Sequence, residues 1–273
     1  MNKFCWLHDR FTGYNKSRFV VIPIPYEKTT SYLKGTKKAP NEIIEASGNI
    51  ELFDYETQKN TAEQGIHTTK PIISSNPEQL IEKAGKLCKK VMQDNKIPVI
   101  LGGEHTVSIG PALAGHDIYE DLTVVQLDAH LDMKDSFEKS RFNHACVMRR
   151  IREKVKDTLH IGVRSCDDEE FNYAKQNKLN IFWDNKYNLK EIEKLTAKNI
   201  YVTIDMDVLN PAITSVGMPE PGGLSWYNTL EIQKTLAKKN VVGFDVVELM
   251  PRKGFEYANI TTAKLIYKLM GYI

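Results

Sequence analysis

Three side chains that can bind a metal ion or move a proton stand at alternate positions in the segment VVQLDAHLDM (124–133). They are Asp128, His130 and Asp132, and they follow an apolar run that is typical of a buried strand. Side chains at positions i, i+2 and i+4 of an extended chain point the same way. If the extended conformation continues beyond the strand, all three side chains could reach one point.

More potential ligands follow two other apolar runs. His105 comes shortly after the run at 97–102, and Asp205 and Asp207 stand at the end of the run at 200–205. In parallel sheets, ligands gather at the carboxyl ends of the strands, so we expect these groups to meet. Six ligands are too many for one four-coordinate zinc ion. Carboxylates with some imidazole suit harder ions such as Mn²⁺, and carboxylates can bridge two ions, so we predict a binuclear centre.

The charge of such a centre predicts the kind of substrate. Four carboxylates cancel the charge of two divalent ions, and a bridging hydroxide would leave the centre mildly negative. A negative centre favours a cationic substrate over a phosphate. The run at 241–247 adds two further acids, Asp245 and Glu248, at the same edge of the predicted sheet.

The elements that must position these groups alternate along the chain. Short, nearly continuous apolar runs are typical of strands covered on both faces, and their alternation with helical patterns indicates a parallel sheet between helices, an α/β/α sandwich. The predicted strands cover 19–24, 97–102, 122–128, 159–164, 180–183, 200–205 and 241–247. The predicted helices cover 77–95, 145–156, 168–178, 189–198, 228–239 and 261–271. The stretch 25–75 has no clear period and is expected to be irregular, with a short helix around Pro40–Ala46. No repeat or linker divides the chain, so we predict one domain over 1–273.

The composition argues against several classes of partner. The chain has 273 residues, 26% of them charged, and a net charge of +2, which indicates no nucleic-acid partner. No window approaches the roughly 18 apolar residues of a membrane span, and the N-terminus has no apolar signal segment. The four cysteines form no C-x-x-C pair, which fits reduced thiols in a cytoplasmic protein. They are Cys5, Cys88, Cys146 and Cys166.

Five blocks of the sequence resemble the ureohydrolases, the arginase–agmatinase group of binuclear manganese enzymes. The blocks are LGGEHTVSIG, LDAHLDM, SRFNHACVMRR, TIDMDVLNPAITSVGMPEPGGLS and GFDVVELMP, all in order. The resemblance covers residues 19 to about 270, and its D-A-H-x-D and D-x-D-V-L-x-P motifs are specific. It implies an eight-stranded parallel sheet, one strand more than the apolar runs predict. It also implies a homo-oligomer, a trimer or a hexamer.

The same resemblance divides the six ligands between two Mn²⁺ ions. One ion would be held by His105, Asp128, Asp132 and Asp205. The other would be held by His130 and Asp207, with Asp128 and Asp205 shared.

The resemblance also assigns the chemistry. A metal-bridging hydroxide would attack the guanidinium carbon, and collapse of the tetrahedral intermediate would yield urea and an amine. Glu248 would pair with the guanidinium, and His144 would shuttle protons. With the ligand Asp132, these two are the predicted catalytic residues.

The loop segments favour agmatine as substrate, with putrescine as the second product. Arginases carry a loop of Ser, Asn and Thr that grips the α-amino acid end of arginine, and a Gly after the shuttle histidine. This chain reads MKDSFEKSRFNHA (133–145) instead, and with 26–47 and 51–57 it looks like agmatinases. Two positions depart from the family pattern. Glu104 stands where Asp is usual and could shift the histidine ligand, and Met218 stands where Thr is common near the pocket rim.

Several alternatives remain open. Guanidinobutyrase or arginase activity would keep the mechanism and change the substrate. A mononuclear zinc deacetylase would need fewer ligands, and a silent homologue would have lost Glu248 or His144. A nucleophile formed by Cys146 with His144 is not supported by sequence proximity alone. The remaining histidines have no acidic partners at ligand spacing and are interpreted as ordinary surface or core residues. They are His8, His67, His116 and His160.

Overall fold

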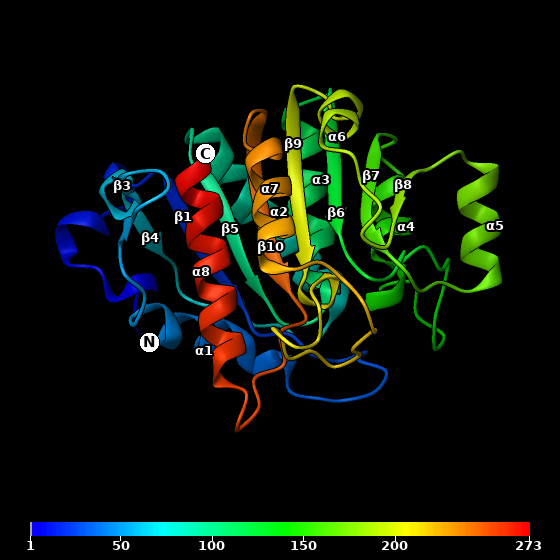
Figure 1. Ribbon diagram of the computed structural model, residues 1–273, viewed down its shortest axis with the longest axis horizontal. Helices are drawn as coiled ribbons and strands as arrows, with labels where there is room; N and C mark the ends of the chain where they lie inside the picture. The colour runs from blue at the N-terminus through cyan, green and yellow to red at the C-terminus, as the bar shows by residue number, and fades with distance from the viewer. Residues whose placement is uncertain (1) are drawn as a thin grey trace.

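The computed structural model describes residues 2–273 and contains one eight-stranded sheet (Figure 1). Its strands are β1 (Phe19–Ile24), β4 (Ile66–Thr68), β5 (Ile97–Gly102), β6 (Leu122–Leu127), β7 (Thr158–Val163), β8 (Asn180–Trp183), β9 (Asn199–Asp205) and β10 (Asn240–Val247). They lie in the order β4-β1-β5-β10-β9-β6-β7-β8, and each neighbouring pair is parallel. The predicted parallel sheet and its seven predicted strands are confirmed.

The eighth strand, β4, lies in the stretch that was expected to be irregular, so that expectation is wrong in part. β4 has only three residues and pairs along β1, from Phe19↔Ile66 to Val21↔Thr68. A run this short carries no readable period. The same stretch also holds a two-stranded antiparallel hairpin of β2 (Phe53–Asp54) and β3 (Lys59–Asn60).

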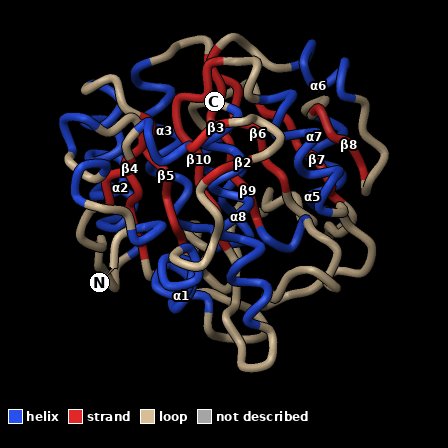
Figure 2. Tube along the Cα trace, turned by 60° about the vertical axis from the view of Figure 1, so that its left-hand side comes forward, coloured by secondary structure: helices blue, strands red, loops and turns tan. Residues whose placement is uncertain are grey.

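Helices cover both faces of the sheet (Figures 1 and 2). The helices are α1 (Ala39–Ser47), α2 (Pro77–Gln93), α3 (Ile109–Ile118), α4 (Val147–Arg152), α5 (Asp168–Gln176), α6 (Leu189–Leu195), α7 (Trp226–Leu236) and α8 (Glu256–Tyr272). Residues of α1, α6, α7 and α8 belong to one apolar cluster, and residues of α2 to α5 belong to the other. The α/β/α sandwich is therefore confirmed.

The predicted helices are present, with changed ends in some cases. The helix predicted at 145–156 is shorter, because the 3-10 turn His144–Cys146 precedes α4. α8 begins five residues earlier than 261, at Glu256. The sequence did not predict α3, whose segment IGPALAGHDI is largely buried and so lacks an alternation of apolar and polar faces.

The layers form because the strands alternate their side chains between two apolar clusters. In β1, Phe19 and Val21 belong to the cluster on one face, while Val20 and Ile22 belong to the cluster on the other. All four are fully buried. Complete burial of such a side chain contributes about 1.5–3 kcal/mol, so the two apolar clusters hold the sheet in place. Among the described residues, no helix has both the length and the apolar character of a membrane span.

Strands that carry the predicted site residues are neighbours in space. β5, β10, β9 and β6 occupy adjacent positions in the sheet. Their register aligns the carboxyl ends, with Leu101 opposite Val246, Val247 opposite Asp205 and Ile204 opposite Leu127. Groups that are more than 140 residues apart in sequence therefore meet at one edge.

Gly103, in the turn after β5, lies in close contact with the neighbouring backbone at this edge. A Cβ atom on Gly103 would lie 2.0 Å from the carbonyl oxygen of Tyr26, whereas a Cβ on Gly13 would meet nothing within 4 Å. We therefore expect Gly103→Ala to reduce the free energy of unfolding by about 1–3 kcal/mol, the usual cost of overpacking. Gly13→Ala is the matched control and should change it little. Guanidinium denaturation measures both; equal stability of the two variants would contradict the close approach.

Candidate metal centre and active site

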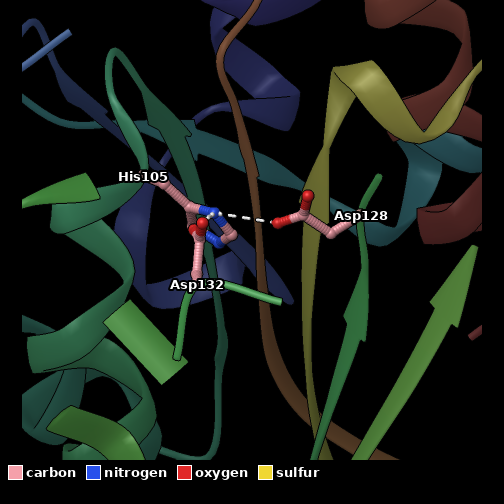
Figure 3. Close-up of side chains that lie close together, drawn as sticks. All are labelled: His105, Asp128 and Asp132. Atoms are coloured by element: carbon pink, nitrogen blue, oxygen red, sulfur yellow. Dashed lines mark ion pairs between the residues drawn. The ribbon is translucent and has the colours of Figure 1, made fainter. Parts of the chain in front are cut away.

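The first group of potential ligands surrounds His105, which follows β5. Its Nδ1 atom lies 2.9 Å from Asp132 Oδ2 and 3.2 Å from Asp128 Oδ2 (Figure 3). Asp205 Oδ2 is 3.5 Å from the same nitrogen. All four residues are buried. His105, Asp128 and Asp132 are close enough for one ligand atom from each to reach a single metal ion.

A second group surrounds His130, at the pocket side of the same edge. Its Nδ1 atom lies 2.8 Å from Asp207 Oδ2 and 3.7 Å from Asp128 Oδ1. These three residues also offer ligand atoms close enough for one ion. Asp128 thus turns one oxygen toward each group. The structure brings all six sequence-predicted residues together in two groups that share Asp128.

The backbone that carries these ligands is not extended throughout, because it turns at Asp132. Asp132 has a φ of 53°, in the left-handed region that non-glycine residues rarely adopt. Its carbonyl accepts hydrogen bonds from Met148 N and Arg149 N, at the start of α4. The expectation that the strand stays extended as far as Asp132 is therefore wrong. The chain turns there, and helix α4 holds the turn.

The hydrogen bonds behind His105 leave a nitrogen lone pair facing the acids. His105 Nε2 lies 2.9 Å from Thr203 Oγ1, and Thr203 donates in turn to Asp245 Oδ1 at 2.6 Å. Because the Thr203 hydrogen goes to Asp245, His105 Nε2 must carry the hydrogen and donate it. The buried Nδ1 atom faces the carboxylates of Asp132 and Asp128, so in the neutral ring it presents a lone pair among their oxygens. A lone pair among carboxylates suits a cation at this point, so the residues fit a metal ion.

The acids are too crowded to be charged together without added positive charge. Burial and the neighbouring Asp128 charge raise the pKa of Asp132 to about 7. Burial and Asp207 raise the pKa of Asp205 well above its ordinary value. Burial opposes protonation of His130, but Asp207 and Asp128 raise its pKa to about 12. Protons or metal ions must supply this positive charge.

A pocket of about 170 Å³ opens over the two groups. His130, Asp132, Asp205 and Asp207 line its floor, and the predicted catalytic residues His144 and Glu248 line its walls. Its lining also includes Tyr32, Leu33, Phe137, Val216 and Met218. The side chain of Met218 is 43% exposed, which places it at the mouth, as expected for a rim residue.

The main chain holds Glu248 in the pocket wall. Its Oε1 accepts a hydrogen bond from His105 N at 2.7 Å, and its own φ is 61°. Burial and the Glu104 charge raise its pKa well above the ordinary value. Such a half-buried carboxylate in the pocket lining is poised to bind a cation, which would restore its charge.

Two hydroxyl groups hold His144 in the pocket lining. Its Nδ1 lies 3.1 Å from Thr29 Oγ1, and its Nε2 lies 3.2 Å from Ser31 Oγ. Burial lowers its pKa below the ordinary value. A neutral imidazole beside the pocket can accept a proton near neutral pH.

The Glu104 side chain contacts the loop that carries Thr29, in addition to preceding the potential ligand His105 in the chain. Its carboxylate accepts hydrogen bonds from Thr29 N at 2.7 Å, Thr29 Oγ1 at 2.8 Å and Thr106 Oγ1 at 2.8 Å. It therefore ties the loop that carries Thr29 to the end of β5. Through Thr29, Glu104 therefore supports His144.

Sequence reasoning missed several partners of the site. Thr203 was not identified, although its position two residues before Asp205 on one strand could have indicated it. Asp245 was identified only as a strand-end acid; it lies within β10 and accepts hydrogen bonds from Thr203 and Tyr201. Glu220 Oε1 lies 3.7 Å from His130 Nε2. Loop contacts of this kind leave no periodic signal.

We expect metal-free protein to lose thermal stability as the pH rises from about 6.5 to 8.5. His105 and His130 have raised pKa values in the fold, so the folded chain binds more protons than the unfolded one in this window. A histidine whose pKa is higher in the folded state than in the unfolded state stabilises the fold at pH values below its unfolded pKa. This stabilisation is lost as the pH rises toward the folded pKa. The Tm should fall by several degrees, and saturating Mn²⁺ should flatten this dependence, because ions replace the protons. Differential scanning fluorimetry measures both curves; a constant Tm without metal would contradict the crowding of charge.

Comparison with known proteins places the chain in a family. The model of the arginase family matches residues 17–272. An N(1)-aminopropylagmatine ureohydrolase of Synechocystis sp. is 39% identical over 97% of this chain and 92% of its own length. An agmatinase of Pyrococcus horikoshii is 34% identical, with 93% and 91% covered. The crystal structure of an agmatine ureohydrolase of Thermoplasma volcanium superimposes with a TM-score of 0.91 at 31% identity, covering 100% of this chain and 94% of that one. The chain therefore belongs to the arginase family.

Proposed function

We propose that the protein hydrolyses the guanidino group of agmatine, or of agmatine carrying an aminopropyl group, and releases urea. The observation that carries this proposal is the pair of ligand groups that share Asp128 on the floor of a pocket with Glu248 and His144 in its walls. The relatives named above support the substrate class, since one is named an agmatinase and one an N(1)-aminopropylagmatine ureohydrolase.

The six predicted ligands would hold two Mn²⁺ ions. The division implied by the resemblance, in which Asp128 and Asp205 are both shared, is supported for five ligands by the two groups: His105 and Asp132 on one side, His130 and Asp207 on the other, with Asp128 between them. Asp205 lies close enough to His105 to join that side. When bound, a pair of divalent ions lowers the pKa of water and supplies hydroxide at neutral pH.

Glu248 would orient the substrate. A guanidinium is a planar cation that donates hydrogen bonds along its edge, and a carboxylate accepts them in a fixed geometry. Glu248 suits this role because the hydrogen bond from His105 N restricts its rotation. It would hold the guanidino carbon above the floor of the pocket, where the oxygen of water adds.

His144 would manage the protons of the reaction. The oxygen of water adds to the guanidino carbon, the bond from that carbon to the amine nitrogen breaks, and the amine leaves with an added proton. His144 faces the pocket and is neutral at neutral pH, so it can take a proton from the reaction and pass it to the leaving amine or to solvent. Thr29 and Ser31 keep its ring in place.

The pocket wall suits a substrate with an apolar chain between charged ends. Tyr32, Phe137 and Met218 would contact the methylenes of agmatine. Agmatine carries no carboxylate, which fits the absence of the loop that would grip one. The product would be putrescine, or spermidine where an aminopropyl group is present, in a cytoplasmic pathway of polyamine biosynthesis. A trimeric or hexameric assembly remains part of the proposal.

Urea release from Mn²⁺-loaded protein tests the proposal. Agmatine, N(1)-aminopropylagmatine, arginine and 4-guanidinobutyrate are compared at equal concentration. We expect urea from one or both of the first two, because the pocket lacks the arginine-gripping loop. Urea from arginine or guanidinobutyrate alone would keep the chemistry and overturn the substrate. No urea from any compound, with two ions bound, would overturn the function.

Two variants tie the activity to the site. Glu248→Gln keeps the shape of the side chain and removes the charge that faces the guanidinium. It should reduce kcat/KM by about two orders of magnitude or more, the scale typical for loss of one preorganised electrostatic group. Asp128→Asn should lose bound metal as well, which elemental analysis of the purified protein detects. Full activity in either variant would contradict the assigned roles.

A further inference from the structure

A hydrogen-bond chain that is buried from Thr158 onward leads to Asp128 across the neighbouring strands β7 and β6. Arg152 Nη1 donates to Thr158 Oγ1 at 2.9 Å, and Thr158 Oγ1 lies 3.1 Å from His160 Nε2. His160 Nδ1 lies 2.6 Å from Gln126 Oε1, and Gln126 Nε2 donates to Asp128 Oδ2 at 2.6 Å. The chain thus passes from the end of α4 through β7 to β6. Gln126 and His160 stand opposite each other on these neighbouring strands.

Hydrogen-bond chemistry fixes the direction of every link. A carboxylate only accepts, so Gln126 turns its NH₂ group to Asp128 and its Oε1 to His160. Because Oε1 also only accepts, His160 Nδ1 carries the hydrogen of the neutral ring, and Nε2 accepts from the Thr158 hydroxyl, whose oxygen accepts from Arg152. Burial and the Arg152 charge lower the pKa of His160 to about 3, which keeps the ring neutral and able both to accept and to donate.

The chain restrains the one carboxylate that serves both ligand groups. Asp128 Oδ2, the oxygen nearer to His105, accepts from Gln126. Asp128 Oδ1, the oxygen that faces His130, accepts from His130 N at 2.6 Å. With one donor on each oxygen, the carboxylate plane cannot rotate freely, and each oxygen keeps a lone pair for an ion. The second amide hydrogen of Gln126 points toward the His130 carbonyl, 3.4 Å away.

We propose that Gln126 and His160 are positioning residues that hold Asp128 between the two metal ions, with Thr158 and Arg152 completing the chain. This inference rests on the binuclear centre of the proposed function. His160, which the sequence presents as an ordinary core histidine, acquires a role toward the site without touching it. Because Gln126 binds Oδ2, the ion on the His105 side depends on it most.

Manganese affinity of the full chain tests the inference. Gln126→Leu removes the donor to Asp128 and keeps a buried side chain of similar size. Its Kd for Mn²⁺, measured by titration calorimetry on metal-free protein, should rise by about 10- to 100-fold at one of the two sites, as is typical when a partner of a metal ligand is lost. The Mn²⁺ electron paramagnetic resonance signal of a coupled pair should weaken at limiting metal.

A milder pair of variants acts at the far end of the chain. Thr158→Val removes the hydroxyl and keeps the shape, whereas Thr158→Ser keeps the hydroxyl. Thr158→Val should weaken Mn²⁺ binding in the same direction as Gln126→Leu, and Thr158→Ser should bind like wild type. Because both changes are small, this pair of variants tests the positioning role even if Gln126→Leu does not fold.

Gln233→Leu is the matched control. Gln233 is fully buried and its Nε2 donates to Leu265 O at 3.5 Å, between α7 and α8. Loss of this amide should lower the Tm and leave both Mn²⁺ affinities unchanged. A purely structural role of Gln126 would give the same result for Gln126→Leu.

The outcomes separate the inference from the function. Wild-type Mn²⁺ affinities in Gln126→Leu and Thr158→Val, with urea release retained in wild type, would overturn the positioning role and leave the function standing. Wild-type protein that binds no Mn²⁺ would overturn both. Weaker Mn²⁺ binding at one site in Gln126→Leu and Thr158→Val, with wild-type affinities in Thr158→Ser and Gln233→Leu, would establish the positioning role of the hydrogen-bond chain.

Discussion

The buried Asp128 carboxylate, shared between two imidazole–carboxylate groups, is the interaction on which the rest of the structure depends. Each of its oxygens faces one group, so a shift of this one side chain would disturb both. Around it, the three other candidate ligand carboxylates, those of Asp132, Asp205 and Asp207, are buried as well. Burying so many like charges is strongly unfavourable unless positive charge balances them. The fold must therefore hold the acids rigidly enough that only protons or metal ions relieve the repulsion.

The parallel sheet supplies that rigidity. β5, β10, β9 and β6 are buried on both faces, and their apolar side chains fix the carboxyl ends in register. The loops beyond these ends depart from regular geometry, because Asp132 and Glu248 both adopt left-handed backbone conformations. Such conformations cost about 1–3 kcal/mol each. They persist because neighbouring elements hold them, Asp132 by the start of α4 and Glu248 by the backbone of His105.

The sequence predicted the elements that have a periodic pattern of apolar residues. It did not predict the features that depend on individual contacts between distant segments. The strand ends, and with them the convergence of His105, His130 and Asp207, followed from the apolar runs and from the parallel sheet that they predict. β4 was missed because three residues carry no period, and α3 because burial on all sides removes its polar face. The partners of Glu104 and the left-handed turn at Asp132 depend on the packing of α4 and of the loop around Thr29. No local pattern encodes such packing, so these features appear only once the elements are assembled.

Under the proposed function, the residues on the pocket floor carry the reaction, whereas the residues of the pocket wall select the substrate. On the floor, Asp132, Asp205 and Asp207 are buried and His130 is half-buried, so a substitution there disturbs the charge balance of closely connected groups. Met218 and Tyr32, at 43% and 64% exposure, have solvent on one side and can change size at little cost to stability. Under the proposed function, such a chain could keep guanidino hydrolysis while its preference for a longer or shorter amine tail shifts. This difference in constraint explains why the resemblance of the five sequence blocks indicated the reaction class, whereas the preferred tail of the substrate depends on the residues at the mouth of the pocket.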